Sequence, residues 1–178
     1  MTIPAVVVWL PVAALTACFM ELWAAVLHGR YWHGRMWFVH RSHHAPRAGR
    51  WELNDALSVV HAPVAMFLII WGCEAAPSWL REVMFGAGLG MTAFGLGYLI
   101  VHDGMVHGRL PVRWLERIGY FERVRQAHLT HHRNSASGLP FGLFLGPWEL
   151  AYFRDKQAPH LPVRSTASRR TARKTPTG

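Results

Sequence analysis

Three long apolar runs are the feature that most constrains how this chain can fold. They cover Ile3 to Leu27, Ala56 to Cys73 and Val83 to Val101, with Glu21 and His61 as ionisable groups inside them. Each run is apolar all round rather than along one stripe, which distinguishes it from a soluble core helix. A transmembrane helix needs about 20 predominantly apolar residues. We therefore predict an all-α integral membrane helical bundle with about three transmembrane helices.

A fourth apolar block, Leu139 to Phe153, is shorter and contains Glu149, Pro140 and Pro147. Proline removes a backbone donor and interrupts a helix interior. We predict a short interfacial or partly re-entrant segment here rather than a fourth span.

The first apolar run occupies the position of a secretory signal peptide. It lacks a basic segment before it and a clear small-residue cleavage site, and it is long for such a signal. These features favour a membrane anchor over a cleaved signal.

The distribution of basic residues orients the predicted bundle. With three spans, every one of the 19 Lys and Arg residues except Arg81 falls on one side of the membrane. The positive-inside rule makes that side cytoplasmic. A fourth span would carry the basic residues from Arg164 onward across the membrane, which argues against it.

The segment 164–178 consists mainly of Ser, Thr, Arg, Lys and Pro. It has too little apolar surface to order itself, so we predict a basic disordered tail near anionic lipid, after a domain covering 1–163. A nucleic-acid partner is not expected, because the tail has no aromatic or folded reader beside its charge.

Histidine is unusually frequent: the chain has 12 histidines and only 10 acidic residues. Ten of them form one spacing that occurs twice, an H-x4-H pair followed by an H-x2-H-H group. Each copy starts at the cytoplasmic end of a predicted span, so both belong to one metal-binding cap. The ten are His28, His33, His40, His43, His44, His102, His107, His128, His131 and His132.

The spacing predicts how these imidazoles meet. On an α-helix, positions i, i+3 and i+4 share one face, so each H-x2-H-H group can direct three imidazoles at one spot. The i, i+5 offset of H-x4-H is poor for one metal on a regular helix, so those pairs approach different metals or flank a distorted turn. Ten imidazoles exceed the needs of one ion, which indicates two metals. Open coordination positions beside a membrane suit oxygen chemistry better than a structural role.

Three polar residues are candidates to accept hydrogen bonds from ligand imidazoles: Asp103, Asn54 and Asp55. The alternatives are a surface carboxylate or a helix cap for Asp103, and capping of the start of the second span for Asn54 and Asp55. Glu21 lies seven residues before His28 and near the same helix face, where it could orient an imidazole. A snorkelling or paired carboxylate is the simpler interpretation of Glu21.

Four histidine motifs and one further stretch carry a family resemblance. They are HGRYWH (28–33), HRSHH (40–44), HDGMVH (102–107) and HLTHH (128–132), with WELND (51–55) after the second. Together they resemble the bacterial beta-carotene hydroxylases within the membrane-bound fatty acid hydroxylase superfamily, over roughly residues 5–155.

The resemblance implies a non-haem di-iron mono-oxygenase that uses O2 and holds two iron ions with the ten histidines. It implies hydroxylation of carotenoid beta-ionone rings at carbon 3, from beta-carotene through cryptoxanthin to zeaxanthin, and from canthaxanthin towards astaxanthin. It also implies a reduced ferredoxin-type electron donor and a place in the bacterial inner membrane, with the metals on the cytoplasmic face.

A carotenoid is a long apolar rod that resides in the bilayer. Small residues recur along the third span at Gly86, Gly90, Ala93 and Gly97. Such a stripe allows close helix packing, or it forms the wall of a groove for the polyene. We keep both interpretations, with the four residues as candidate substrate contacts.

Other functions fit parts of the pattern. A carotenoid ketolase or a fatty acid or sterol hydroxylase would share the metal site. A b-type haem protein would need paired histidines within the spans, where only His61 lies deep. A metal transporter would need polar residues through the spans, and the third has no ionisable group.

Overall fold

The computed structural model describes residues 5–46, 49, 51–133 and 138–157, and within them every regular element is helical. The fold class predicted above is therefore confirmed. In chain order the elements are α1 (Ala5–Val26), η1 (Leu27–Arg35), α2 (Trp37–His44), α3 (Asp55–Ser58), α4 (Ala62–Glu74), α5 (Trp79–Tyr98), η2 (Leu99–Val106), η3 (Arg113–Arg117), α6 (Gly119–Arg133) and α7 (Gly146–Gln157).

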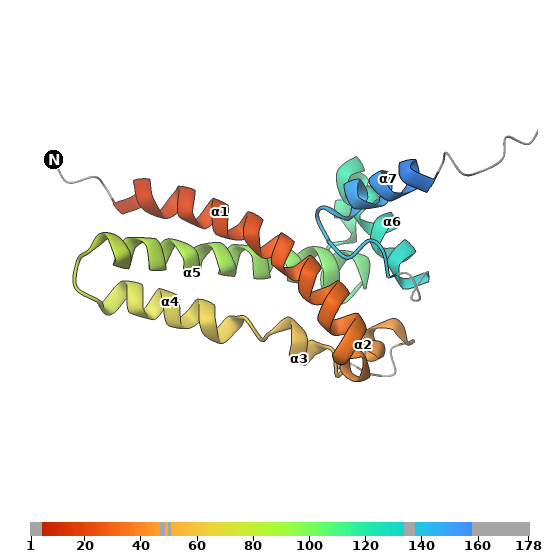
Figure 1. The fold of residues 1–178 in the computed structure, drawn as a ribbon, viewed down its shortest axis with the longest axis horizontal. Helices are drawn as coiled ribbons and strands as arrows, with labels where there is room; N and C mark the ends of the chain where they lie inside the picture. Colours follow the sequence, from red (N-terminus) through yellow and green to blue (C-terminus); the bar gives the residue numbers. More distant parts are fainter. Residues whose placement is uncertain (1–4, 47–48, 50, 134–137, 158–178) are drawn as a thin grey trace, which may run out of the picture.

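Three stretches of helix are long and apolar enough to cross a membrane: Ala5–Arg35, Asp55–Glu74 and Trp79–Val106. In Figure 1, α1, α4 and α5 run side by side, and α5 packs against both of the others. Large apolar side chains cover the outside, as at Leu15 (71% exposed) and Phe67 (60% exposed). This surface suits contact with lipid tails, and the three predicted spans are confirmed.

The glycines of α5 explain why it lies in the middle. A Cβ on Gly90 would collide with the carbonyl oxygen of Ala13 on α1, and one on Gly86 would lie 3.0 Å from the carbonyl oxygen of Trp9. On the opposite side, a Cβ on Gly88 would lie 2.8 Å from Cγ1 of Ile69 on α4. Both neighbouring helices therefore approach α5 at positions where a side chain would not fit.

The sequence suggested one continuous α-helix for the second span, but the structure has two helices there. The short helix α3 ends at Ser58, and α4 begins at Ala62 with Pro63 in its first turn. Proline lacks the N–H that would continue the preceding helix, and its ring disfavours helical backbone just before it. The break lies at residues 59–61 and leaves His61 at the start of α4.

The cap lies at the end of the bundle where η1 and η2 extend α1 and α5 (Figure 1). Its apolar core joins η2 to α6 and to the loop before α7, through Val101, Met105, Val106, Val124 and Leu143. Helix α7 packs against α6. This core fixes the elements that carry the second copy of the histidine pattern.

The fourth apolar block forms a loop at residues 138–145 and then α7, rather than a span. Two carboxylates hold the loop through its backbone. Glu149 Oε2 accepts hydrogen bonds from the N–H groups of Phe141 and Gly142, each at 3.0 Å, and Glu21 Oε1 accepts one from Leu145 at 2.8 Å. Glu21 thus binds this loop rather than an imidazole. The predicted basic tail, 164–178, lies outside the described residues.

Candidate metal centre

The H-x4-H pairs lie at two π-helices: His28 and His33 are within η1, His102 is within η2, and His107 directly follows η2. The N–H of His107 donates to the carbonyl of His102 at 3.0 Å, five residues back, and Met36 does the same to Tyr31 at 2.7 Å. In a π-helix, hydrogen bonds join residues five apart, which brings those residues to one face. The distorted-turn alternative is therefore the one observed, and each pair directs both imidazoles to the same place.

Five imidazoles gather in the first cluster, which we call group one. Its ligand nitrogens all lie within 4.8 Å of one another. The Nε2 atoms of His28 and His40 are 3.0 Å apart, those of His44 and His40 3.2 Å, and those of His33 and His131 3.2 Å. Group one consists of His28, His33, His40, His44 and His131.

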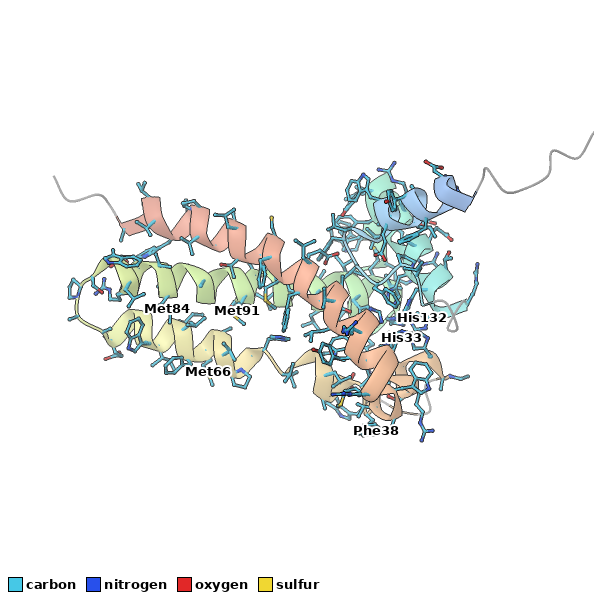
Figure 2. The ribbon with its side chains drawn as sticks, in the orientation of Figure 1. His33, Phe38, Met66, Met84, Met91 and His132 are labelled. Carbon is cyan, nitrogen blue, oxygen red and sulfur yellow. The ribbon has the colours of Figure 1, made fainter. Side chains whose placement is uncertain are left out.

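Four further imidazoles, His43, His102, His107 and His128, likewise have ligand nitrogens within 4.8 Å of one another. His132 joins them: its Nε2 lies 2.9 Å from that of His128 and 3.2 Å from that of His43. We call these five group two. Figure 2 labels His33 of group one and His132 of group two, both in the cap.

The H-x2-H-H groups behave differently from the sequence expectation. They do not direct three imidazoles at one spot. His40 and His44 point to group one, whereas His43, between them on α2, points to group two. In the second copy, His128 and His132 point to group two and His131 to group one. Each copy thus builds four-fifths of one group and contributes one imidazole to the other.

These distances fit metal binding. Two imidazole nitrogens bound to one ion at about 2.1 Å, at a right angle, lie about 3 Å apart. Burial lowers the pKa of His40 and of His44 to about 3, and that of His131 to about 4. These side chains are therefore neutral at pH 7, which is the form that binds metals. The residues present can accommodate two ions with imidazole ligands.

The second ring nitrogens of group one contact neutral oxygen atoms. His28 Nδ1 lies 2.9 Å from the carbonyl oxygen of Phe141, and His131 Nδ1 contacts that of Gly138. His40 Nδ1 lies 2.7 Å from Asn54 Oδ1. The loop before α7 and the predicted Asn54 thus orient three of the five rings. The loop's role was not visible in the sequence.

In group two the second ring nitrogens contact carboxylates. His102 Nδ1 lies 3.1 Å from Asp103 Oδ1, and His43 Nδ1 lies 3.4 Å from Glu52 Oε2. Asp103 therefore lies where the sequence placed it, whereas Glu52 was missed although it belongs to the WELND stretch. Asp55 pairs with Arg109, at 2.6 and 3.1 Å.

A cavity of about 520 Å³ lies between α1, α4 and α5. Its wall includes Met66 and Met91, labelled in Figure 2, and it reaches Trp32 and Asp103 beside the histidines. Gly86, Gly90, Ala93 and Gly97 do not line it. Gly86 and Gly90 face α1, Ala93 is exposed and Gly97 lies near Phe144. The small-residue stripe is therefore not the cavity wall.

His61 lines the same cavity and is half-buried. Trp23 Nε1 donates a hydrogen bond to its Nε2 at 3.0 Å. Because an indole N–H only donates, the proton of neutral His61 lies on Nδ1. The pair ties α1 to the start of α4 and lies apart from both histidine groups.

The chain matches the Fatty acid hydroxylase family model over residues 13–152. It is 46% identical over 131 residues to a chloroplastic beta-carotene hydroxylase of Capsicum annuum and to a chloroplastic beta-carotene 3-hydroxylase of Gentiana lutea. Each match covers 74% of this chain and 41% of the relative, so the chain spans about two fifths of these plant proteins.

A bacterial relative is matched over more of its length. The beta-carotene hydroxylase of Pantoea ananas is 41% identical over 135 residues, which cover 75% of this chain and 74% of the relative. No solved structure matches the chain. The histidine-lined helical cap and these matches lead to one conclusion: the chain belongs to the fatty acid hydroxylase family.

Proposed function

We propose that this protein hydroxylates carotenoid beta-ionone rings at carbon 3, converting beta-carotene to cryptoxanthin and then zeaxanthin. The observation that carries the proposal is the 41% identity to the Pantoea ananas beta-carotene hydroxylase, most of whose length is matched. The family model alone names fatty acid hydroxylases and would leave the substrate open. Keto-carotenoids such as canthaxanthin are further substrates under the same proposal.

The cofactor proposed is a pair of non-haem iron ions, one held by the five histidines of each group. The support is the convergence of their Nε2 atoms at separations suited to shared ligation. Two ferrous ions with O2 would supply an oxidant able to remove hydrogen from an unactivated ring carbon. The hydrogen-bond partners of the imidazoles hold the rings in place, and six of the ten histidines are buried: His28, His40, His43, His102, His128 and His131.

The cavity is the proposed binding place for the carotenoid. Its wall is largely apolar, and Met66, Ile70 and Leu96 in that wall are each more than half exposed, so the cavity is open along the spans. A polyene can therefore enter sideways from the lipid. Trp32 lines the cavity and also contacts the rings of His28 and His40, with centroids 5.7 Å away in each case. It would hold a beta-ionone ring next to group one.

The proposed setting is the bacterial inner membrane, with the cap on the cytoplasmic face and electrons delivered by a reduced ferredoxin-type protein. The distribution of basic residues supports this orientation. Residues 1–163 would form the membrane domain and 164–178 a basic tail near lipid head groups.

The test is expression in a bacterial host that accumulates beta-carotene, followed by pigment chromatography. We expect cryptoxanthin and zeaxanthin to replace beta-carotene. Canthaxanthin or echinenone instead would identify a ketolase, and unchanged beta-carotene in cells with membrane-inserted, iron-loaded protein would contradict the proposal. Metal analysis of the purified protein should give about two iron ions per chain.

A further inference from the structure

The two histidine groups differ in the charge of the atoms behind them. In group one, Nδ1 atoms contact two backbone carbonyls and the side-chain amide of Asn54. In group two, Nδ1 atoms contact the carboxylates of Glu52 and Asp103. The two groups are otherwise built from the same parts, so this difference is the main asymmetry between them.

Arg109 ties these carboxylates together. Its guanidinium lies 2.6 Å from Asp55 Oδ1, 3.4 Å from Glu52 Oε1 and 3.6 Å from Asp103 Oδ1. The backbone N–H of Arg109 donates a hydrogen bond to the carbonyl oxygen of Asp103 at 2.8 Å. The four side chains are 10–19% exposed. The arrangement joins the segment after α2 to the end of η2 and fixes both carboxylates against their imidazoles.

The consequence for bound cations is electrostatic. The carboxylates of Glu52 and Asp103 contact group-two imidazoles directly, whereas the oxygen atoms that contact group one are neutral and the carboxylates of Glu21 and Glu149 lie one step further away, on the loop backbone. A carboxylate that accepts from a ligand imidazole fixes the ring and increases its basicity, and removing such a partner costs 10- to 100-fold in metal affinity. Group two should gain this affinity and group one should not.

We propose that the two metal sites are unequal, and that Glu52 and Asp103, held by Arg109, are positioning residues that make group two the tighter site. This inference rests on the proposed two-metal centre. It predicts that group two fills first and that its ion is the last to leave in the presence of a chelator.

The experiment is anaerobic titration of metal-stripped full-length protein in detergent with Fe²⁺, against a competing chelator. The wild-type protein should show two affinity classes that differ by at least about 10-fold. His28→Ala should remove only the weaker class and His107→Ala only the tighter one, which assigns each class to its group.

Two isosteric exchanges then test the cause. Asp103→Asn removes the charge behind His102 and should weaken the tighter class by about 10- to 100-fold while sparing the weaker one. Asn54→Asp places a carboxylate behind His40 and should tighten the weaker class. Together the two variants should narrow or reverse the difference in Fe²⁺ affinity between the two sites.

Equal affinities in the wild-type protein would overturn the inference. So would an Asp103→Asn protein in which both classes weaken alike, because a merely structural role disturbs the whole cap. If Asp103→Asn does not fold, Glu52→Gln serves in its place, since it removes the carboxylate charge 3.4 Å from His43 Nδ1 and keeps the size of the side chain. Unequal sites in a protein that makes no hydroxylated carotenoid would overturn the proposed function and leave this inference intact.

Discussion

The spans and the cap of this protein are held together in different ways. In the spans, α5 contacts its neighbours through glycines, and the main requirement is that side chains be small or apolar. In the cap, most of the ten imidazoles have a specific hydrogen-bond partner or a ring neighbour from another element. Substitutions in the spans should therefore change the yield of folded protein or the access of substrate. Substitutions in the cap should change the rate of hydroxylation per folded molecule.

The largest effect should come from removing an imidazole that one copy of the histidine pattern contributes to the group built mainly by the other copy. His131→Ala removes a group-one ligand candidate and should lower carotenoid hydroxylation at least about 100-fold, because losing a direct ligand should cost more than losing its hydrogen-bond partner. Membrane insertion should persist, because the spans remain apolar. Zeaxanthin formation per inserted protein is the measurement.

His160→Ala is the matched control, since His160 belongs to neither copy of the pattern. It should form zeaxanthin at the wild-type rate. Near-normal activity of His131→Ala would contradict the ligand assignment. Loss of the His131→Ala protein from the membrane would contradict the separation between spans and cap.

A pair of glycines on one helix tests the span side of the comparison. Gly90 lies against α1, whereas a Cβ built on Gly95, which lines the cavity, would have no atom of the described residues within 4 Å apart from its own helix backbone and chain neighbours. Gly95→Leu should place a side chain in the cavity and lower carotenoid turnover about 10-fold with iron content unchanged. A tenfold fall in turnover corresponds to about 1.4 kcal/mol in the activation free energy.

Gly90→Leu should act differently. Its side chain cannot fit beside the backbone of Ala13, so the yield and thermal stability of the folded protein should fall together. The two variants are compared by activity per folded molecule. A Gly90→Leu protein that folds normally, or a Gly95→Leu protein with full activity, would show that the cavity and packing surfaces are wrongly placed.

The sequence predicted the spans well, because hydropathy over about 20 residues reports directly on the lipid environment. It did not locate the break at residues 59–61, although Pro63 was a signal for it. It also treated Gly86 and Gly90 as a single stripe. Gly88, between them, was the clue that both faces of α5 need close approach and that α5 is the central helix.

The sequence predicted which histidines gather in the cap, but it did not predict how they are arranged there. Spacing identified the ten histidines, since a duplicated pattern on one side of the membrane is a strong local signal. The π-helices at η1 and η2 join residues five apart, a geometry that a rule for α-helices cannot predict. For the same reason the assignment of His43 and His131 to opposite groups required the fold.

The smallest expected effect concerns Glu21, the residue that links the two regions. It lies on α1 and is 5% exposed, yet its Oε1 accepts a hydrogen bond from Leu145 in the loop before α7. The carbonyls of that loop contact His28 and His131 of group one. A span residue thus supports two candidate metal ligands indirectly, through the backbone of a loop.

Two substitutions separate the charge of Glu21 from its hydrogen bond. Glu21→Gln keeps an acceptor for Leu145, and the Oε2 atom that it replaces has no hydrogen-bond partner among the described residues. It should change the unfolding free energy by less than about 1 kcal/mol. Glu21→Ala leaves the N–H of Leu145 without its acceptor and should cost about 1–3 kcal/mol.

Because the loop then loosens, the iron affinity of group one should fall a few-fold, while that of group two is unchanged. Thermal unfolding and Fe²⁺ titration of the same samples measure both effects. Equal stability of the Ala and Gln variants would show that the loop does not depend on Glu21, and an equal loss of affinity in both groups would show that the loop acts on the whole cap.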